Sequence, residues 1–131
     1  MKKVIIFLLS LILLTACSVA SPLTVTKQWL EQLEQNPEQA ISLMVIKKDN
    51  SVQNFSDQDK QDYIKNFEKE YGQITEYSVQ NAIPLNEGQL KDYGVTEGYE
   101  VYYTQWSKNS GEAHLKILVV KVDGKWKIVK P

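Results

Sequence analysis

The hydrophobic and polar positions divide the chain into an apolar run, a stretch of helical period and a stretch of alternating period. Residues 4–14 are apolar except for Ser10. From residue 22 to about residue 72, apolar side chains recur every three or four positions, which predicts amphipathic helices. From about residue 77 onward they recur every second position, which predicts strands. The pattern therefore predicts a leader-like segment and one α+β domain with its helices first.

Two helices are predicted near the start of the domain. Ser21 precedes a proline, which is typical of an N-cap followed by proline at the first helical position, and the apolar stripe continues to Gln35. Asn36 before Pro37 repeats this start signal and predicts a second, short helix. The apolar face of the second helix would contain Ala40, Ile41, Met44 and Val45.

A third helix is predicted after a polar stretch. Residues 47–54 are mostly polar and are expected to form a loop. Ser56 with Asp59 three residues later is a variant capping box, with Phe55 in the preceding staple position. Gly72 suits the C-terminal end of this helix.

Four strands are predicted in the second half, with a hairpin between the last two. Asp123-Gly124 is a strong two-residue hairpin signal. Residues 85–98 contain three glycines and are expected to form a long loop at the rim of the domain. The strands are expected at residues 77–83, 99–106, 113–122 and 126–128.

The N-terminal apolar run has the properties of a signal peptide. Its eleven residues, 4–14, are too few to span a bilayer, which needs about 20 helical residues. A short cationic start, residues 1–3, precedes it. This combination is typical of the hydrophobic region of an export signal.

The residues after this run resemble the lipobox of bacterial lipoproteins. Leu14, Thr15 and Ala16 precede Cys17, the only cysteine in the chain. The resemblance implies that the Cys17 thiol receives a diacylglycerol group and that signal peptidase II cleaves between Ala16 and Cys17. An ordinary secretory leader followed by a free cysteine is the alternative. The expected organisation is a signal peptide over 1–16, a lipidated tether over 17–21 and a single domain over 22–131.

The composition excludes several classes of function. All fifteen basic residues are lysines. Without the Lys2 and Lys3 of the leader, thirteen lysines face sixteen acidic residues, a formal net charge of −3. This balance argues against nucleic-acid binding, which needs a basic surface. A single cysteine excludes an internal disulfide, and with one histidine it argues against a zinc site. The sequence implies no metal and no cofactor.

The domain resembles small lipoproteins of the nuclear-transport-factor-2-like, or cystatin-like, superfamily. The likeness rests on the element order, on Asn36-Pro37-Glu38 at the second helix and on the closing stretch 118–128, with Asp-Gly-Lys-Trp at 123–126 as its sharpest motif. It implies helices packed on a curved antiparallel sheet of about four strands, with a cone-shaped pocket between them. Members of this superfamily include isomerases, binding modules and dimerisation modules, so the fold does not settle function.

No residue is assigned a catalytic role. The resemblance to isomerases implies an aspartate base and a tyrosine paired with a second acid, which needs carboxylates on the inward face. Asp123 lies in a turn, Glu100 faces away from its strand neighbours Val101 and Tyr103, and Glu112 begins a strand. His114 is interpreted as a solvated or packed strand residue, because no carboxylate is available to orient it as a base.

An aromatic set is the candidate for pocket lining. Its members could border a site for an apolar ligand, although such residues more often form the core. The set comprises Trp29, Tyr103, Trp106 and Trp126.

Three functions remain open at this point. The first is a non-enzymatic, lipid-anchored envelope protein that binds an envelope protein or an apolar small molecule and is anchored through Cys17. The second is a small-molecule carrier or isomerase-like enzyme that uses the cone pocket, and the third is a surface-exclusion or immunity lipoprotein. The resemblance also permits a homodimer. Ser18 after the cysteine would direct the protein to the periplasmic face of the outer membrane, if the host is Gram-negative.

Overall fold

The computed structural model describes residues 21–131. The expected signal peptide, the lipobox residues Leu14, Thr15 and Ala16, and Cys17 lie outside the described residues. The elements in chain order are α2 (Pro22–Gln35), α3 (Pro37–Ile41), β1 (Met44–Lys48), β2 (Ser51–Gln53), α4 (Asp57–Glu70), β3 (Ile74–Pro84), α5 (Glu87–Tyr93), β4 (Gly98–Ser107), β5 (Gly111–Val122) and β6 (Lys125–Val129).

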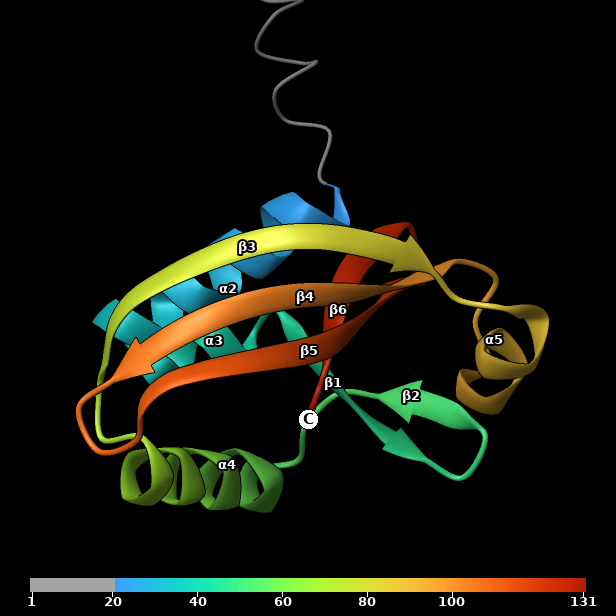
Figure 1. The fold of residues 1–131 in the computed structure, drawn as a ribbon. Helices are drawn as coiled ribbons and strands as arrows, with labels where there is room; N and C mark the ends of the chain where they lie inside the picture. The colour runs from blue at the N-terminus through green and yellow to red at the C-terminus, as the bar shows by residue number, and fades with distance from the viewer. Residues whose placement is uncertain (1–20) are drawn as a thin grey trace, which may run out of the picture.

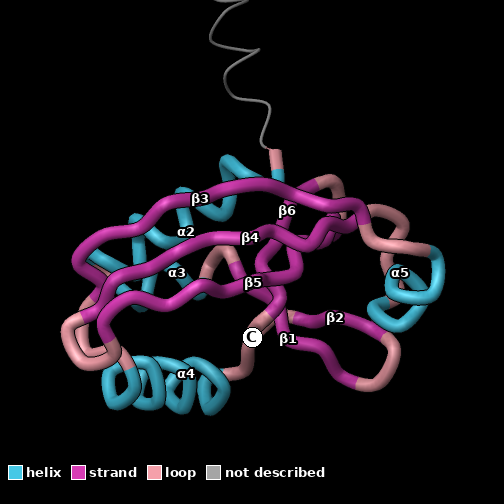
Figure 2. Tube along the Cα trace, viewed as in Figure 1, coloured by secondary structure: helices cyan, strands magenta, loops and turns pink. Residues whose placement is uncertain are grey.

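The strands form one curved sheet, and the helices are distributed around it. The strand order is β2-β1-β6-β5-β4-β3, and all neighbouring strands are antiparallel except β1 and β6. In Figure 1, α2 and α3 lie behind the curved strands, α4 lies below β5, and α5 lies at the other end beside β2. Figure 2 shows the long strands β3, β4 and β5 following the same curve. The predicted α+β class with helices on a curved sheet is confirmed.

The predicted helix starts are confirmed by their caps. The hydroxyl of Ser21 accepts a hydrogen bond from the Thr24 N–H at 3.1 Å, and Pro22 begins α2. The Ser56 hydroxyl accepts from the Asp59 N–H at 3.1 Å, while the Asp59 carboxylate accepts from the Ser56 N–H at 3.0 Å. This reciprocal capping box begins α4, because it satisfies N–H groups that have no partner inside the helix.

The second predicted helix is wrong in its length. It ends at Ile41, and Met44 and Val45 instead belong to β1, which pairs in parallel with Ile128 and Val129 of β6. Met44 is 2% exposed in the main core and Val45 is 1% exposed on the opposite side of the strand. A short apolar run suits a helix or a doubly buried strand equally well, so only the partner strand decides between them.

Two predicted loops contain regular structure. The strands β1 and β2 raise the strand number from the predicted four to six, and the parallel pair of β1 and β6 makes the sheet mixed. Residues 47–54 hold the end of β1 and β2, whose residues pair across a tight turn. Residues 85–98 hold α5, which begins with a capping box of Asn86 and Gln89 and ends at Gly94 with a positive φ of 64°. No residue of α5 is fully buried, so the helix lacks the apolar stripe by which a helix is detected.

The apolar side chains form two clusters on opposite faces of the sheet. The main core fills the concave face beneath α2, α3 and α4 and includes Trp29, Leu30, Val101 and Ile128, which are all at most 2% exposed. A smaller cluster of Val45, Leu85, Val120 and Val129 lies where α5 and β2 cover the other face. Strand β5 lies between the two clusters. It is apolar on both faces over residues 117–120, as is typical of a central strand.

Candidate ligand-binding site

Helix α4 has a cavity on each side. We call the first the α3–α4 cavity; it has a volume of about 730 Å³ and is lined mainly from α3, the start of β1 and the first half of α4. We call the second the α4–sheet cavity; it has a volume of about 740 Å³ and lies between the second half of α4, the strands β4 and β5 and the C-terminal residues. Both volumes are in the range of small-molecule sites in proteins.

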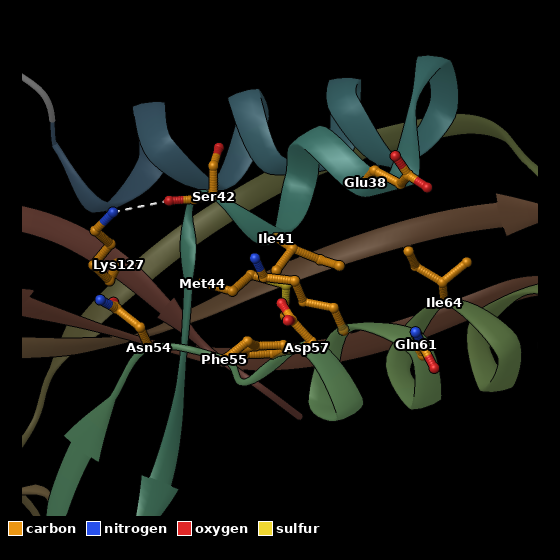
Figure 3. A pocket seen from close by; sticks show the side chains of 11 residues that line it. Glu38, Ile41, Ser42, Met44, Asn54, Phe55, Asp57, Gln61, Ile64 and Lys127 are labelled. Carbon is orange, nitrogen blue, oxygen red and sulfur yellow. Dashed lines mark hydrogen bonds between the residues drawn. The ribbon is translucent and has the colours of Figure 1, made fainter.

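The α3–α4 cavity has an apolar floor and a rim of mixed charge. Figure 3 shows Ile41, Met44, Phe55 and Ile64 around its centre, with polar side chains at its margins. The Lys127 ammonium at the rim donates a hydrogen bond to the Ser42 carbonyl oxygen at 2.9 Å. The charged residues on the rim are Glu38, Asp57, Lys60 and Lys127. Their charges balance, so the rim does not select for one sign of ligand.

A row of aromatic rings docks α4 onto the rest of the domain. Tyr63, Phe67 and Tyr71 are four residues apart and therefore share one face of the helix. The ring centroids of Tyr63 and Phe67 are 6.2 Å apart, and those of Phe67 and Tyr71 are 5.3 Å apart. Phe55, just before the helix, lies 5.9 Å from Tyr63 in an edge-to-face arrangement. Only Tyr63 and Phe67 are buried within α4 itself.

The structure brings together two members of the predicted aromatic set. Trp29 of α2 and Tyr103 of β4 pack edge to face with centroids 5.9 Å apart, and both line the α4–sheet cavity. Trp126 packs instead against Tyr99, at 5.6 Å, away from this cavity. Trp106 is half-buried and lies on the opposite face of β4 from its neighbour Gln105, because side chains alternate along a strand.

Two polar atoms in the wall of the α4–sheet cavity are buried without a hydrogen-bond partner among the described residues. They are Nε1 of Trp29 and Nε2 of Gln105, and both side chains are 2% exposed. An unsatisfied buried polar group costs about 1–3 kcal/mol. The sequence analysis did not identify Gln105 as a site residue. Its alternation with Val101 and Tyr103 nevertheless indicates a polar side chain on the inward face of the strand.

The buried phenols in this wall are held in their neutral form. Burial raises the pKa of Tyr63, and the nearby Tyr103 and Tyr71 raise it further. Burial likewise raises the pKa of Tyr103, with a smaller contribution from Tyr71. The Trp29 indole acts on the pKa of Tyr63 in the opposite direction, so the two groups are close, but they do not form a hydrogen bond of standard geometry.

The candidate acid and base residues lie on the outer face of the sheet. Glu100 accepts a hydrogen bond from the Tyr102 hydroxyl and pairs with the Lys116 ammonium at 3.5 Å. The Tyr102 hydrogen bond, followed by the charge of Lys116, lowers the pKa of Glu100. His114 is exposed, and its Nδ1 lies 3.1 Å from the Thr104 hydroxyl. Within residues 21–131, no three His, Cys, Asp or Glu residues are grouped so that they could hold a metal ion.

Comparisons with known proteins found a family match for the N-terminus and a likeness of fold for the domain. Residues 1–18 match the prokaryotic membrane lipoprotein lipid attachment site. A crystal structure of a Campylobacter jejuni protein, assigned as an NTF2-like transpeptidase, superposes with a TM-score of 0.50. It has 13% sequence identity and covers 86% of this chain and 100% of that chain. No match was found among curated proteins.

The chain is thus a membrane-anchored lipoprotein of the cell envelope, and the fold of its domain is similar to that of the NTF2-like protein. The lipid attachment site supports anchoring through a lipidated cysteine. Within the part of the chain that the structure describes, no helix is long and apolar enough to cross a membrane. The structural likeness extends to the fold and not to an activity, because fold and function are separable.

Proposed function

We propose that this protein is a non-enzymatic envelope lipoprotein that binds a small ligand in the α4–sheet cavity. The observation that carries this proposal is the pair of unpartnered donors, Trp29 Nε1 and Gln105 Nε2, in the wall of a cavity of about 740 Å³. Buried polar groups in native proteins are almost always paired, so a buried donor without a protein partner calls for an explanation. A ligand that supplies the missing acceptors explains both atoms.

The anchor in this proposal is the thiol of Cys17. Residues 1–18 contain one cysteine, and it follows the lipobox residues Leu14, Thr15 and Ala16 directly. Cleavage between Ala16 and Cys17 leaves a tether of about four residues before α2, which spans at most ~15 Å. The cavity is then held close to a bilayer surface. With Ser18 after the cysteine, the proposed site in a Gram-negative host is the periplasmic face of the outer membrane.

Binding rather than catalysis suits the chemistry of the cavity wall. The pKa values of Tyr63 and Tyr103 are raised, so neither phenol loses its proton readily to act as a base at neutral pH. The one acidic side chain in the lining is Glu70, at the C-terminal end of α4. Glu100 of β4 and Glu112 and His114 of β5 lie on the outer face, by the alternation of side chains along the paired strands. A binding role needs none of them.

The anchor is tested by replacing Cys17 with serine and following processing and membrane fractionation in the native host. We expect Cys17→Ser to abolish cleavage by signal peptidase II and incorporation of labelled palmitate. Ser18→Ala changes a neighbouring small residue and is the matched control, which should be processed normally. Unchanged processing and fractionation of Cys17→Ser would refute the anchor.

The ligand is tested by native mass spectrometry of the protein purified from its own envelope. A reproducible adduct of small mass, lost from a variant whose cavity is filled by Leu115→Trp, is the expected result. The matched control is Leu118→Trp, which alters a half-buried position on the opposite face of β5. A bare protein mass in every preparation would refute ligand binding and favour a protein-interaction module instead.

A further inference from the structure

We propose that the ligand of the α4–sheet cavity has an apolar body and presents a carboxylate or carbonyl oxygen to Trp29 Nε1 and Gln105 Nε2. The inference rests on the proposed function and adds the chemical class of the ligand. It also assigns a role to α4, which must move for this oxygen to reach the two donors.

The donors determine the polarity of the ligand head. An indole N–H can only donate a hydrogen bond, so the group that partners Trp29 must be an acceptor. The amide of Gln105 can donate or accept, because its two ends exchange by rotation, and it is therefore compatible with the same acceptor. Trp29 comes from α2 and Gln105 from β4, so the two donors belong to separate elements that form the same cavity wall.

The charges around the cavity favour the same class of ligand. Three lysines line it, Lys69, Lys116 and Lys130, against one acidic side chain, that of Glu70. Lys116 is already paired with Glu100 at 3.5 Å on the outer side of β5. The other two lysines outnumber Glu70 by one positive charge, and this excess among the lining side chains favours a ligand with a negative or partially negative head. An ammonium head would meet both this excess and two donors, and should be rejected.

The body of the ligand would contact aromatic and aliphatic surface. Phe67, Tyr71 and Leu115 line the cavity together with the Trp29–Tyr103 pair. Aromatic walls with a small number of polar groups are typical of sites for small organic molecules. A ligand with a compact aromatic or acyl body and a carboxylate or carbonyl head therefore fits the site, because the body would contact the apolar side chains and the head would accept from the two donors.

Helix α4 covers the donors and is weakly docked. Trp29 Nε1 and Gln105 Nε2 are fully buried, so the ligand cannot touch them unless a neighbouring side chain moves. Tyr63 of α4 lies close enough to Trp29 for the indole to lower its pKa. The helix has a cavity on each side and docks through Tyr63 and Phe67 alone among its own buried residues. An outward displacement of α4 would therefore uncover the donors and would cost the packing of Tyr63 and Phe67, which contacts with the ligand body would have to offset.

The experiment measures the binding of three matched probes to the full lipidated chain in nanodiscs by titration calorimetry. The probes are 4-phenylbutyrate, its uncharged methyl ester, and 4-phenylbutylamine, which has the same body and no acceptor. We expect the acid to bind best, the ester more weakly, and the amine at least about tenfold more weakly than the acid. Empty nanodiscs give the background from the lipid.

Two conservative variants test the donors. Trp29→Phe keeps an aromatic ring without the N–H, and Gln105→Met keeps the length of the side chain without the amide. Each should weaken the binding of 4-phenylbutyrate by about tenfold or more, since hydrogen bonds to charged groups are the stronger kind. Gln105→Met should also keep or raise the unfolding midpoint without ligand, because it removes an unpartnered buried donor. Trp29→Phe should lower the midpoint, because the smaller ring leaves a cavity at a position that is 2% exposed. Gln53→Met, an exposed position on β2, is the control and should change neither quantity.

The possible results separate this inference from the proposed function. Equal binding of acid and amine, or unchanged acid binding in both variants, would overturn the ligand class and leave the cavity as a binding site. No binding of any of the three probes would also overturn it, and the mass spectrum of the native protein would then decide separately whether the cavity is occupied. Faster hydrogen exchange across α4 in the acid complex than in the free protein is expected for the outward displacement of α4, and slower or unchanged exchange would contradict that displacement.

Discussion

At the scale of single residues, the inward face of β4 concentrates the chemistry of the domain. Val101, Tyr103 and Gln105 alternate along the strand and are at most 4% exposed. Alternation in the sequence predicts that these side chains share a face, but it does not predict that the amide of Gln105 lacks a partner. Whether the amide finds a hydrogen-bond partner depends on the atoms that α2 and α4 place beside it, and these helices are distant from Gln105 in the sequence.

The buried phenols make the stability of the domain sensitive to alkaline pH. Burial raises the pKa of Tyr63 and Tyr103 above the ordinary value near 10, so the unfolded chain releases these protons at a lower pH than the folded chain does. Their contribution to stability is complete below pH 10 and is lost as the pH rises above it, by up to about 1.4 kcal/mol per pH unit for each group. Urea unfolding between pH 9 and pH 11 measures this slope.

The double variant Tyr63→Phe and Tyr103→Phe is the comparison for this prediction. It has no phenol at either position, so its free energy of unfolding should fall less steeply above pH 10 than that of the unaltered protein. The same slope in both proteins would show that other groups cause the alkaline loss of stability.

At the scale of elements, caps and turns were easier to predict than the short segments between them. The capping box of Ser56 and Asp59 acts within four residues, and so it is readable from the sequence. The strand β1 and the helix α5 could not be predicted in this way, because distant residues stabilise them. The strand β1 pairs in parallel with β6, and α5 packs on the hairpin of β1 and β2. Leu90 and Tyr93 of α5 pack on the smaller core without being fully buried.

The contact between α5 and this hairpin depends on Gly94. Its φ is 64°, and a Cβ at this position would lie 2.6 Å from the backbone oxygen of Asn50. Gly94→Ala should therefore lower the free energy of unfolding through both backbone strain and a collision with the hairpin. Gly111→Ala is the matched control, because its φ is 67° and a Cβ there meets no atom within 4 Å.

The control should cost only the strain of the left-handed conformation, about 1–2 kcal/mol. Gly94→Ala should cost measurably more in urea unfolding, because its collision is with backbone that cannot rotate away. Equal losses for the two variants would mean that the hairpin moves freely and does not fix α5.

At the scale of the whole molecule, the anchor and the domain are separate in the sequence. The lipid attachment site matches residues 1–18, whereas the residues of the two buried clusters lie between Val25 and Val129. All residues of both clusters therefore follow the attachment site in the sequence. Membrane attachment should therefore determine where the domain is located and not how it folds.

This separation predicts that loss of the lipid leaves the stability of the domain unchanged. A chain that begins at residue 18 behind an ordinary cleavable leader should have the same thermal unfolding midpoint as the lipidated protein, to within about 2 °C, when both are measured in the same detergent. Truncation to residue 23 is the contrasting variant, because it removes the Ser21 cap of α2, worth about 1 kcal/mol. A large drop on removal of the lipid alone would show that the anchor contributes to folding.

The sequence by itself determined the features that arise from local interactions. These are the leader and its lipobox, the caps at Ser21 and Ser56, the hairpin at Asp123-Gly124 and the change of period that defines the α+β class. Each involves residues within a few positions of one another, so the physical cause lies within a short window of the chain.

Only the tertiary structure decided the sheet order and the cavities. The pairing of Met44 with Ile128 and the meeting of Trp29 with Tyr103 join residues more than seventy positions apart. Whether a buried donor such as Gln105 Nε2 finds an acceptor depends on every element packed around it. Burial and hydrogen-bond satisfaction are properties of the assembled fold, and for that reason the proposed site became visible only in three dimensions.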